Sequence, residues 1–237
     1  MSYINKTVSL NCTEKEFIKA FINELTNAES RIICETDIDT EFENEDTSHK
    51  PTIILNVNNC YKLKLVRDYV INDTGFKYNI CRVVNDIEYD STDLRFSENY
   101  AYISAVVTRT LKFTIISNEN LINIRFCSYD TDLKDYVFSA ISYHEDKFNI
   151  AAYNISKEFV RTDENSLAES YKVANRLLYT RSDEDVEIIE SKVLMQNDIA
   201  VHDMKNVYDC SNIIAGNILS FDNNRYFSID TNTLIKI

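Results

Sequence analysis

The stretch Leu111–Phe126, which reads LKFTIISNENLINIRF, decides the fold class. Apolar side chains occupy every second position in both of its halves: Leu111, Phe113 and Ile115, and then Ile122, Ile124 and Phe126. Such alternation is typical of a β-strand with one buried face, and the polar residues Ser117-Asn118-Glu119 between the two runs are typical of a tight turn. The stretch therefore predicts a β-hairpin.

Strand patterns flank this hairpin on both sides. A second hairpin is predicted from residues 136–143 and 147–153, joined across His144-Glu145-Asp146. Further strand patterns cover residues 30–34, 53–57, 61–65, 76–84, 213–221, 226–229 and 234–237. Residues 186–195 are compatible with either a helix or a strand. The sequence thus predicts an α+β, mostly β fold, with antiparallel sheets arranged as a sandwich or a barrel.

Two short amphipathic helices complete the predicted fold. Thr13-x-x-Glu16 is a capping box, and the residues after it place apolar side chains on one helical face: Phe17, Ile18, Phe21, Ile22 and Leu25. The same signature, Ser166-x-x-Glu169, precedes a second run at helical spacing: Leu167, Tyr171, Ala174 and Leu178. We expect helices over residues 14–27 and 166–179.

The chain divides by pattern into three ranges. Residues 1–98 form a domain with the first helix and a β-sheet, and the polar residues 85–99 mark its boundary. Residues 99–160 form a β-hairpin domain. Residues 161–237 contain the second helix and a C-terminal β segment, and these residues can form one unit with the second range. No internal repeat is present.

Composition excludes several classes of protein. The 237 residues carry a formal net charge of -13, which repels a phosphate backbone, so we expect no nucleic-acid partner. The N-terminus lacks the pattern of a signal peptide, and no window is apolar enough for a membrane span. We therefore expect a soluble chain made in a cytoplasm, and its six cysteines, none in a Cys-x-x-Cys motif, to be reduced thiols.

Glycine and histidine are scarce enough to exclude common catalytic motifs. The chain has two glycines, Gly75 and Gly216, so it cannot contain a dinucleotide fingerprint, a phosphate-binding loop or a nucleophile elbow. Asn and Asp must make the turns that glycine usually makes. His49, His144 and His202 are not spaced as zinc ligands. We assign no catalytic, cofactor-binding or metal-binding residue and expect a protein that is not an enzyme.

One acidic run has two interpretations. Five carboxylates alternate with other residues and would align on one side of an extended segment: Asp37, Asp39, Glu41, Glu43 and Glu45. A hard cation such as calcium suits such a face. The EF-hand pattern fails, because Phe42 stands where glycine is needed and Ser48 where glutamate is needed. A solvated, mobile acidic loop that ends before Pro51 is the favoured interpretation.

Tyrosine suggests another kind of site. Five of the fifteen tyrosines lie in or near the predicted hairpins: Tyr100, Tyr102, Tyr136, Tyr143 and Tyr153. They suit a sugar-stacking or protein-binding face, and half-buried sheet positions explain them equally well. Two alternatives to a structural role follow. One is a receptor- or glycan-binding module, and the other is a small cytoplasmic enzyme with a site assembled from distant acids.

The C-terminal segment Asn224–Ile237, NRYFSIDTNTLIKI, resembles the closing β segment of virion proteins from tailed phages of low-GC Gram-positive hosts. The pattern of a short strand followed by Phe17–Leu25, FIKAFINEL, is similar to tail-associated proteins. The resemblance covers about a fifth of the chain and carries no catalytic motif. It implies a structural protein of a virion tail, baseplate or neck, assembled in the host cytoplasm. The implied partners are other virion subunits and further copies of itself, with a host surface receptor as an additional candidate.

Overall fold

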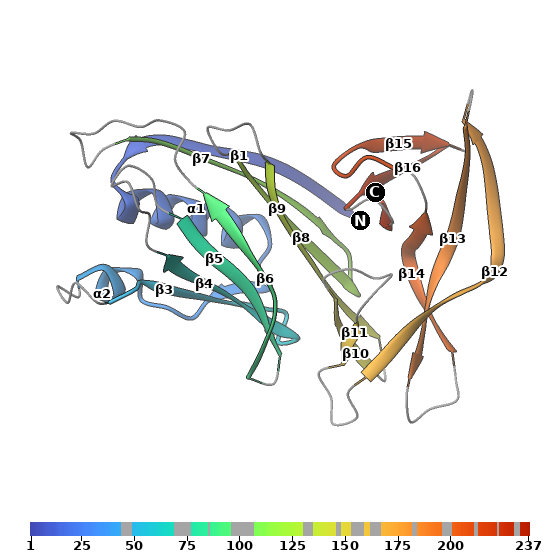
Figure 1. Ribbon diagram of the computed structural model, residues 1–237, viewed down its shortest axis with the longest axis horizontal. Coiled ribbons are helices and arrows are strands. Elements are labelled where there is room, and N and C mark those ends of the chain that lie inside the picture. The colour runs from blue at the N-terminus through green and yellow to red at the C-terminus, as the bar shows by residue number, and fades with distance from the viewer. Residues whose placement is uncertain are drawn as a thin grey trace. The chain divides into compact units, whose positions relative to one another are not determined.

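The computed structural model describes residues 1–43, 49–68, 77–84, 86–95, 107–129, 135–145, 148–152, 159–161, 167–181, 184–195, 201–210, 213–221, 223–229 and 233–237. Within these residues the protein is mostly β, with antiparallel sheets and two helices, as predicted (Figure 1). The hydrogen-bonded strand orders are β1-β7-β8-β9-β10-β11-β12-β13-β14-β17-β16-β15 and β2-β3-β4-β5-β6. Both orders are open-ended, so the described strands form no closed barrel.

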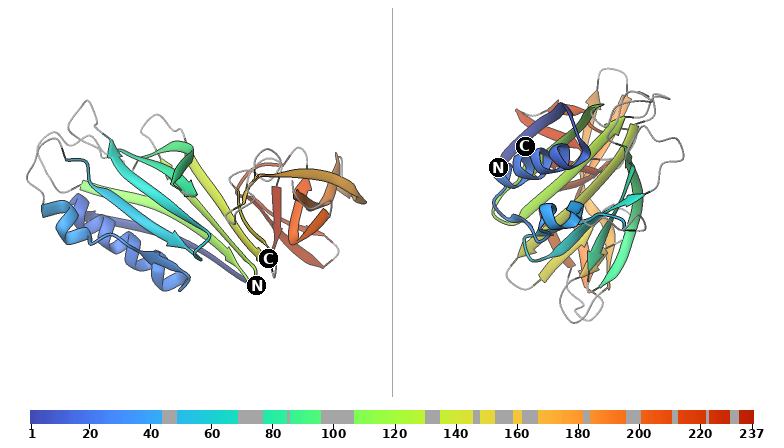
Figure 2. Two further views of the ribbon diagram at one scale, coloured as in Figure 1. Left: turned by 90° about the horizontal axis from the view of Figure 1, so that it is seen from below. Right: turned by 90° about the vertical axis from the view of Figure 1, so that its left-hand side faces the viewer.

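The chain forms two compact units from interleaved segments. The helical unit comprises Ile4–Ile115 and Ile124–Phe138, and the C-terminal unit comprises Met1–Tyr3, Ile116–Asn123 and Ser139–Ile237. Strands β1 (Ser2–Cys12), β7 (Val107–Ser117), β8 (Leu121–Tyr129) and β9 (Asp135–Glu145) contribute residues to both units. Figure 2 shows the same elements from two further directions.

The remaining elements belong to one unit each. The helical unit holds α1 (Glu14–Ala28), β2 (Ile32–Cys34), α2 (Ile38–Glu43), β3 (Thr52–Val57), β4 (Tyr61–Asp68), β5 (Lys77–Val84) and β6 (Ile87–Arg95). The C-terminal unit holds β10 (Phe148–Ala152), β11 (Phe159–Arg161), β12 (Leu167–Arg181), β13 (Glu184–Met195), β14 (Val201–Cys210), β15 (Ile218–Phe221), β16 (Asn224–Ser228) and β17 (Thr233–Lys236).

Helix α1 confirms the first predicted helix. The Thr13 hydroxyl accepts from the Glu16 backbone N–H, and the Glu16 carboxylate accepts from the Thr13 backbone N–H at 2.9 Å. This capping box satisfies two of the N–H groups that a helix start leaves without partners. The apolar face is fully buried at Phe17, Phe21 and Leu25. The helix is thereby fixed at its start by hydrogen bonds and along its length by packing.

The hairpin predicted from the decisive stretch is also present. Strands β7 and β8 are neighbours in the sheet, and the Asn118 side chain accepts from the backbone N–H groups of Asn120 and Leu121 in the turn. All six alternating apolar residues of that stretch are completely buried. The second predicted hairpin is formed by β9 and β10, which pair antiparallel from Phe148↔Glu145 to Ala152↔Ile141.

Asn and Asp occupy backbone positions with a positive φ, where glycine is the usual residue. Five residues other than glycine have a positive φ in the described chain: Asn58, Asn59, Asp86, Asn206 and Asn223. Short polar side chains tolerate this left-handed region better than other residues do. The prediction that Asn and Asp replace glycine in turns is confirmed at Asn58, Asn59, Asp86 and Asn223, whereas Asn206 lies inside strand β14.

The helix predicted over residues 166–179 is wrong. Ser166 lies outside the described residues, and Leu167–Arg181 is strand β12, paired antiparallel with β13 over its length. The pairing shifts register between Lys172 and Arg176. The capping box and the helical spacing are local signals, and the pairing with β13 overrules them. The ambiguous residues 186–195 belong to strand β13.

Candidate functional site

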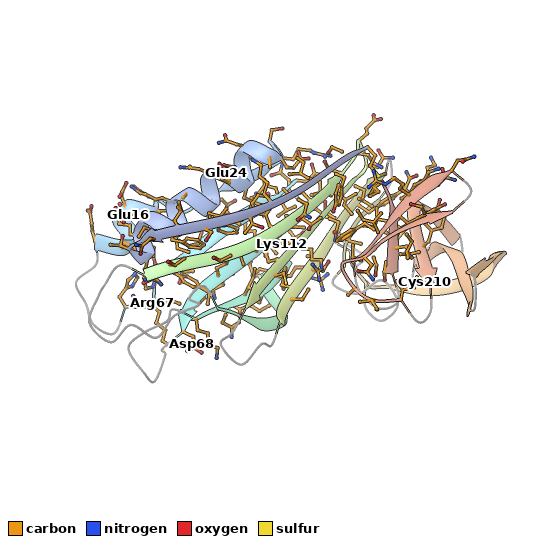
Figure 3. All side chains as sticks on the ribbon, turned by 90° about the horizontal axis from the view of Figure 1, so that it is seen from above. Glu16, Glu24, Arg67, Asp68, Lys112 and Cys210 are labelled. Atoms are coloured by element: carbon orange, nitrogen blue, oxygen red, sulfur yellow. The ribbon has the colours of Figure 1, made fainter. Side chains whose placement is uncertain are left out.

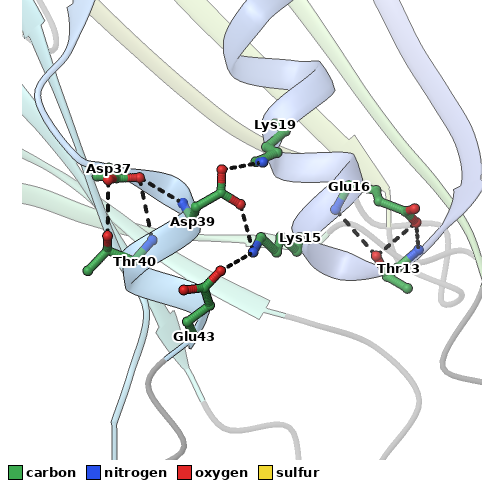
Figure 4. Close-up of polar contacts among 8 residues, drawn as sticks. All are labelled: Thr13, Lys15, Glu16, Lys19, Asp37, Asp39, Thr40 and Glu43. Carbon is green, nitrogen blue, oxygen red and sulfur yellow. Dashed lines mark hydrogen bonds and ion pairs between the residues drawn. The ribbon is translucent and has the colours of Figure 1, made fainter.

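The acidic run forms part of a short helix that is tied to α1. Asp37 precedes α2, and its carboxylate accepts from the Asp39 and Thr40 backbone N–H groups and from the Thr40 hydroxyl (Figure 4). Asp39 in turn pairs with Lys15 at 2.7 Å and with Lys19 at 2.6 Å. These bonds and the nearby lysines lower the pKa of the Asp39 carboxyl, with the hydrogen bond from Lys15 as the largest cause. The prediction of an extended segment or loop is therefore wrong over Ile38–Glu43.

The carboxylates of this run are engaged within the protein and do not converge on one point. Glu43 pairs with Lys15 at 3.5 Å, and Glu41 lies 3.0 Å from His49 Nε2 and accepts from the Thr52 backbone N–H at 2.7 Å. Glu45 lies outside the described residues. No three His, Cys, Asp or Glu side chains gather at metal-binding distance in the described part of the chain. Asp39 and Glu43 have lysines of α1 as partners, and Glu41 instead contacts His49 and Thr52.

Glu14 is a buried carboxylate at the start of α1. It is the first residue of this helix and is 8% exposed. Its carboxylate accepts hydrogen bonds from the Tyr78 hydroxyl at 2.6 Å and from Arg67 at 3.2 Å. Burial raises the pKa of this carboxyl, and the bonds from Tyr78 and Arg67 only partly oppose that effect. The site joins the start of α1 to β4 and β5. Figure 3 shows Arg67 beside Asp68 at the end of β4.

The groups around Glu14 respond to the same burial. Burial raises the pKa of Tyr78 well above its usual value, and the Glu14 charge adds to that effect. Burial lowers the pKa of Arg109, which is 1% exposed, and Glu14 opposes the shift. Tyrosine therefore stays protonated at neutral pH and donates to the carboxylate. Both carboxylate oxygens of Glu14 carry a protein donor, so the arrangement favours a structural connection over acid–base chemistry on a substrate.

A polar cavity of about 260 Å³ lies against the same sheet, lined by Lys50, Val66, Arg67, Asp68, Asn79, Cys81 and Glu88. Cys81 donates to Glu88, which also accepts from Lys64 at 2.5 Å. A thiol beside a carboxylate resembles a nucleophile with a general base. However, burial and the Glu88 charge raise the pKa of the Cys81 thiol to about 11, so it is not activated at neutral pH.

The tyrosine and cysteine predictions have separate outcomes. Tyr143 is completely buried, and its hydroxyl accepts from the Lys205 backbone N–H at 3.3 Å, so it belongs to the core and not to a binding face. The side chains of Tyr100, Tyr102, Tyr136 and Tyr153 lie outside the described residues, so the rest of that hypothesis stays a prediction. None of the six cysteines forms a disulfide in this structure, and their reduced state stays a prediction.

Sequence reasoning missed the buried charges, although signals for them exist. Glu14 stands three and four residues before Phe17 and Ile18, which places it on the apolar face of α1. Arg109 is in phase with Leu111 on β7, and Arg82 is in phase with Ile80 on β5; both arginines are buried. Reading charged residues in phase with apolar ones would have found all three.

Comparisons with protein-family models, with curated proteins and with solved structures give no match. Neither helix in the described residues is both long and apolar enough to span a bilayer.

Proposed function

We propose that this protein is a non-catalytic structural component of a tailed-phage particle, located in its tail, baseplate or neck. It acts through subunit packing, with other virion proteins and further copies of itself as partners. The resemblance of the C-terminal segment to closing β segments of phage virion proteins motivates the proposal.

The observation that carries the proposal is the structure of that same segment. Its described residues form β16 and β17, which pair with each other, and β17 also pairs with β14. Leu234 and Ile235 near the end of the chain are completely buried. The pairing of this segment into the sheet supports the proposed role, because the resemblance is to a β segment that closes a sheet.

The state of the ionisable groups supports a role without catalysis. Glu14 is held by two donors, the Cys81 thiol is protonated at neutral pH, and Asp39 is paired with lysines. These groups stabilise contacts inside the helical unit. Glu14 attaches α1 to β4 and β5, and Asp39 attaches α2 to α1.

Density-gradient fractionation of induced or infected source cells, followed by quantitative mass spectrometry, tests the proposal. We expect this chain to co-sediment with intact particles at a fixed ratio to a known structural protein, and to remain after a high-salt wash. An abundant cytoplasmic enzyme measured in the same fractions is the control for trapped material. Recovery only in the soluble fraction would refute the proposal and favour the glycan-binding or enzymatic alternatives.

A further inference from the structure

The described strands leave four sheet edges, and one of them differs from the others. Strand β1 exposes Lys6, β2 is three residues long, and β6 contains four charged residues. Charge and shortness are features by which proteins prevent edge strands from pairing with other chains. Strand β15, whose one neighbour among the described strands is β16, carries no charge. This edge lacks the charge that protects β1 and β6.

The pairing of this edge extends beyond the strand itself. The Gly216 backbone N–H donates to Ser228 at 2.7 Å, and the Ser228 N–H donates to Asn217 at 2.9 Å. Gly216 has a φ of 85°, a left-handed value that glycine adopts without strain. The ordered edge therefore runs over residues 216–221, long enough for a partner strand to pair with it.

An apolar row crosses the sheet and ends unfinished at β15. The register pairs Val207 with Ile235, Ile235 with Phe227, and Phe227 with Ile218, so these four side chains share one face of neighbouring strands. Val207 and Ile235 are completely buried and Phe227 is 2% exposed, whereas Ile218 is 39% exposed. Ile214, just before the strand, is 72% exposed. One more strand beside β15 would continue the row and cover Ile218.

The sequence around the edge determines which partner fits. The twelve residues from Cys210 to Phe221 carry no charge, although the chain as a whole has a net charge of -13. A strongly basic partner would find no opposite charge in this stretch. A second copy, in contrast, can approach here without placing like charges opposite each other, and two antiparallel copies of one strand are self-complementary about a two-fold axis.

We propose that the edge of β15 is a self-association surface, at which β15 of a second copy pairs antiparallel so that the two Ile218 side chains join one apolar row. This inference rests on the proposed structural role and names one partner and one contact for it. Antiparallel pairing keeps opposed side chains on the same face, so the second copy presents its own apolar row in phase with the first.

Sedimentation velocity of the full-length protein tests the inference, over about 1 to 100 µM protein and at about 50 and 500 mM NaCl. We expect a reversible dimer that tightens at the higher salt concentration, because salt screens the repulsion between two acidic copies. Ile218→Lys should raise the dissociation constant at least about tenfold, since it places like charges at the contact. Ile33→Lys is the matched control: Ile33 is 56% exposed on the edge strand β2, and its replacement should leave the constant unchanged.

Circular dichroism and the unfolding midpoint establish that each variant is folded. If Ile218→Lys does not fold, Ser220→Lys, at another exposed position of β15, replaces it as the test variant. A monomer at every concentration and salt, a dimer indifferent to the β15 substitutions, or a dimer weakened by salt would each overturn the inference. A monomeric protein that still co-sediments stoichiometrically with particles would overturn self-pairing and leave the structural function standing. A β15-dependent dimer that does not co-sediment with particles would overturn the structural function and leave self-pairing standing.

Discussion

Replacing Phe21 by alanine should remove a large share of the stability of the helical unit. Phe21 is completely buried on α1. Its ring centroid lies 6.1 Å from that of Phe113 of β7 and 5.6 Å from that of Phe126 of β8, and both pairs are edge-on. A buried Phe→Ala change costs about 3–5 kcal/mol, and each aromatic pair adds about 0.5–1.5 kcal/mol beyond burial. We expect a loss of about 4 kcal/mol, a substantial part of the roughly 5–15 kcal/mol that stabilises a typical domain.

Urea unfolding followed by helical circular dichroism measures this loss. With a denaturant slope of about 2 kcal/mol per molar urea, the midpoint should fall by about 2 M. Phe21→Leu keeps most of the volume and should cost less than about 1.5 kcal/mol. Asn23→Ala, at an exposed position of the same helix, should stay within about 0.5 kcal/mol. A loss below about 1 kcal/mol for Phe21→Ala would refute the packing of α1 against β7 and β8.

Three further predictions concern the helix start and the buried groups. Thr13→Ala removes the capping hydroxyl and should cost about 1 kcal/mol in the same urea assay; an unchanged midpoint would contradict the capping box. The raised pKa of Glu14 means that the folded state holds its proton more tightly than the unfolded chain does, so this group's contribution to stability falls as the pH rises above about 4.5. The free energy of unfolding of Glu14→Gln, measured relative to that of the native protein, should therefore be higher at about pH 7.5 than at about pH 4. A difference between the two proteins that does not change with pH would exclude this linkage. Since the pKa of Cys81 is raised from 9.0 to about 11, its alkylation at about pH 8 should be about one hundredfold slower than in the unfolded chain, as measured by peptide mass spectrometry; equal rates would count against the buried thiol.

Elements with local signals were readable from the sequence. The hairpin of β7 and β8 depends on alternation and on the Asn118 turn, and α1 depends on the Thr13 capping box, all within a few residues of one another. Pairing between distant segments left no such signal. Ser9 and Thr110 share a hydrogen bond at 2.8 Å across 101 positions, and nothing in either sequence indicates the other.

The two wrong predictions have physical causes. Over residues 167–181 the helical spacing is a local signal, and antiparallel pairing with β13, a separate segment of the chain, overrules it. In the acidic run, alternation suggested an extended segment, but Asp37 caps α2, and Lys15 and Lys19 stabilise Asp39. The pairing of β12 and the lysine partners of Asp39 come from other parts of the chain, whereas the cap at Asp37 is local.

Composition could exclude functions but could not locate a contact surface, because a residue acquires its role only from its position in the sheet. The uncharged tract from Cys210 to Phe221 is visible in the sequence, but its pattern is the same as that of an apolar strand buried in the core. Leu219 in this tract is indeed buried at 4% exposure, while the adjacent Ile218 is exposed because no described strand follows β15 in the sheet order. The strand order, which depends on pairing between segments distant in sequence, is what turns an ordinary strand pattern into an interaction surface. A charge placed at Ile218 therefore tests the strand order and the proposed self-association together, whereas the same charge at Ile33 tests neither.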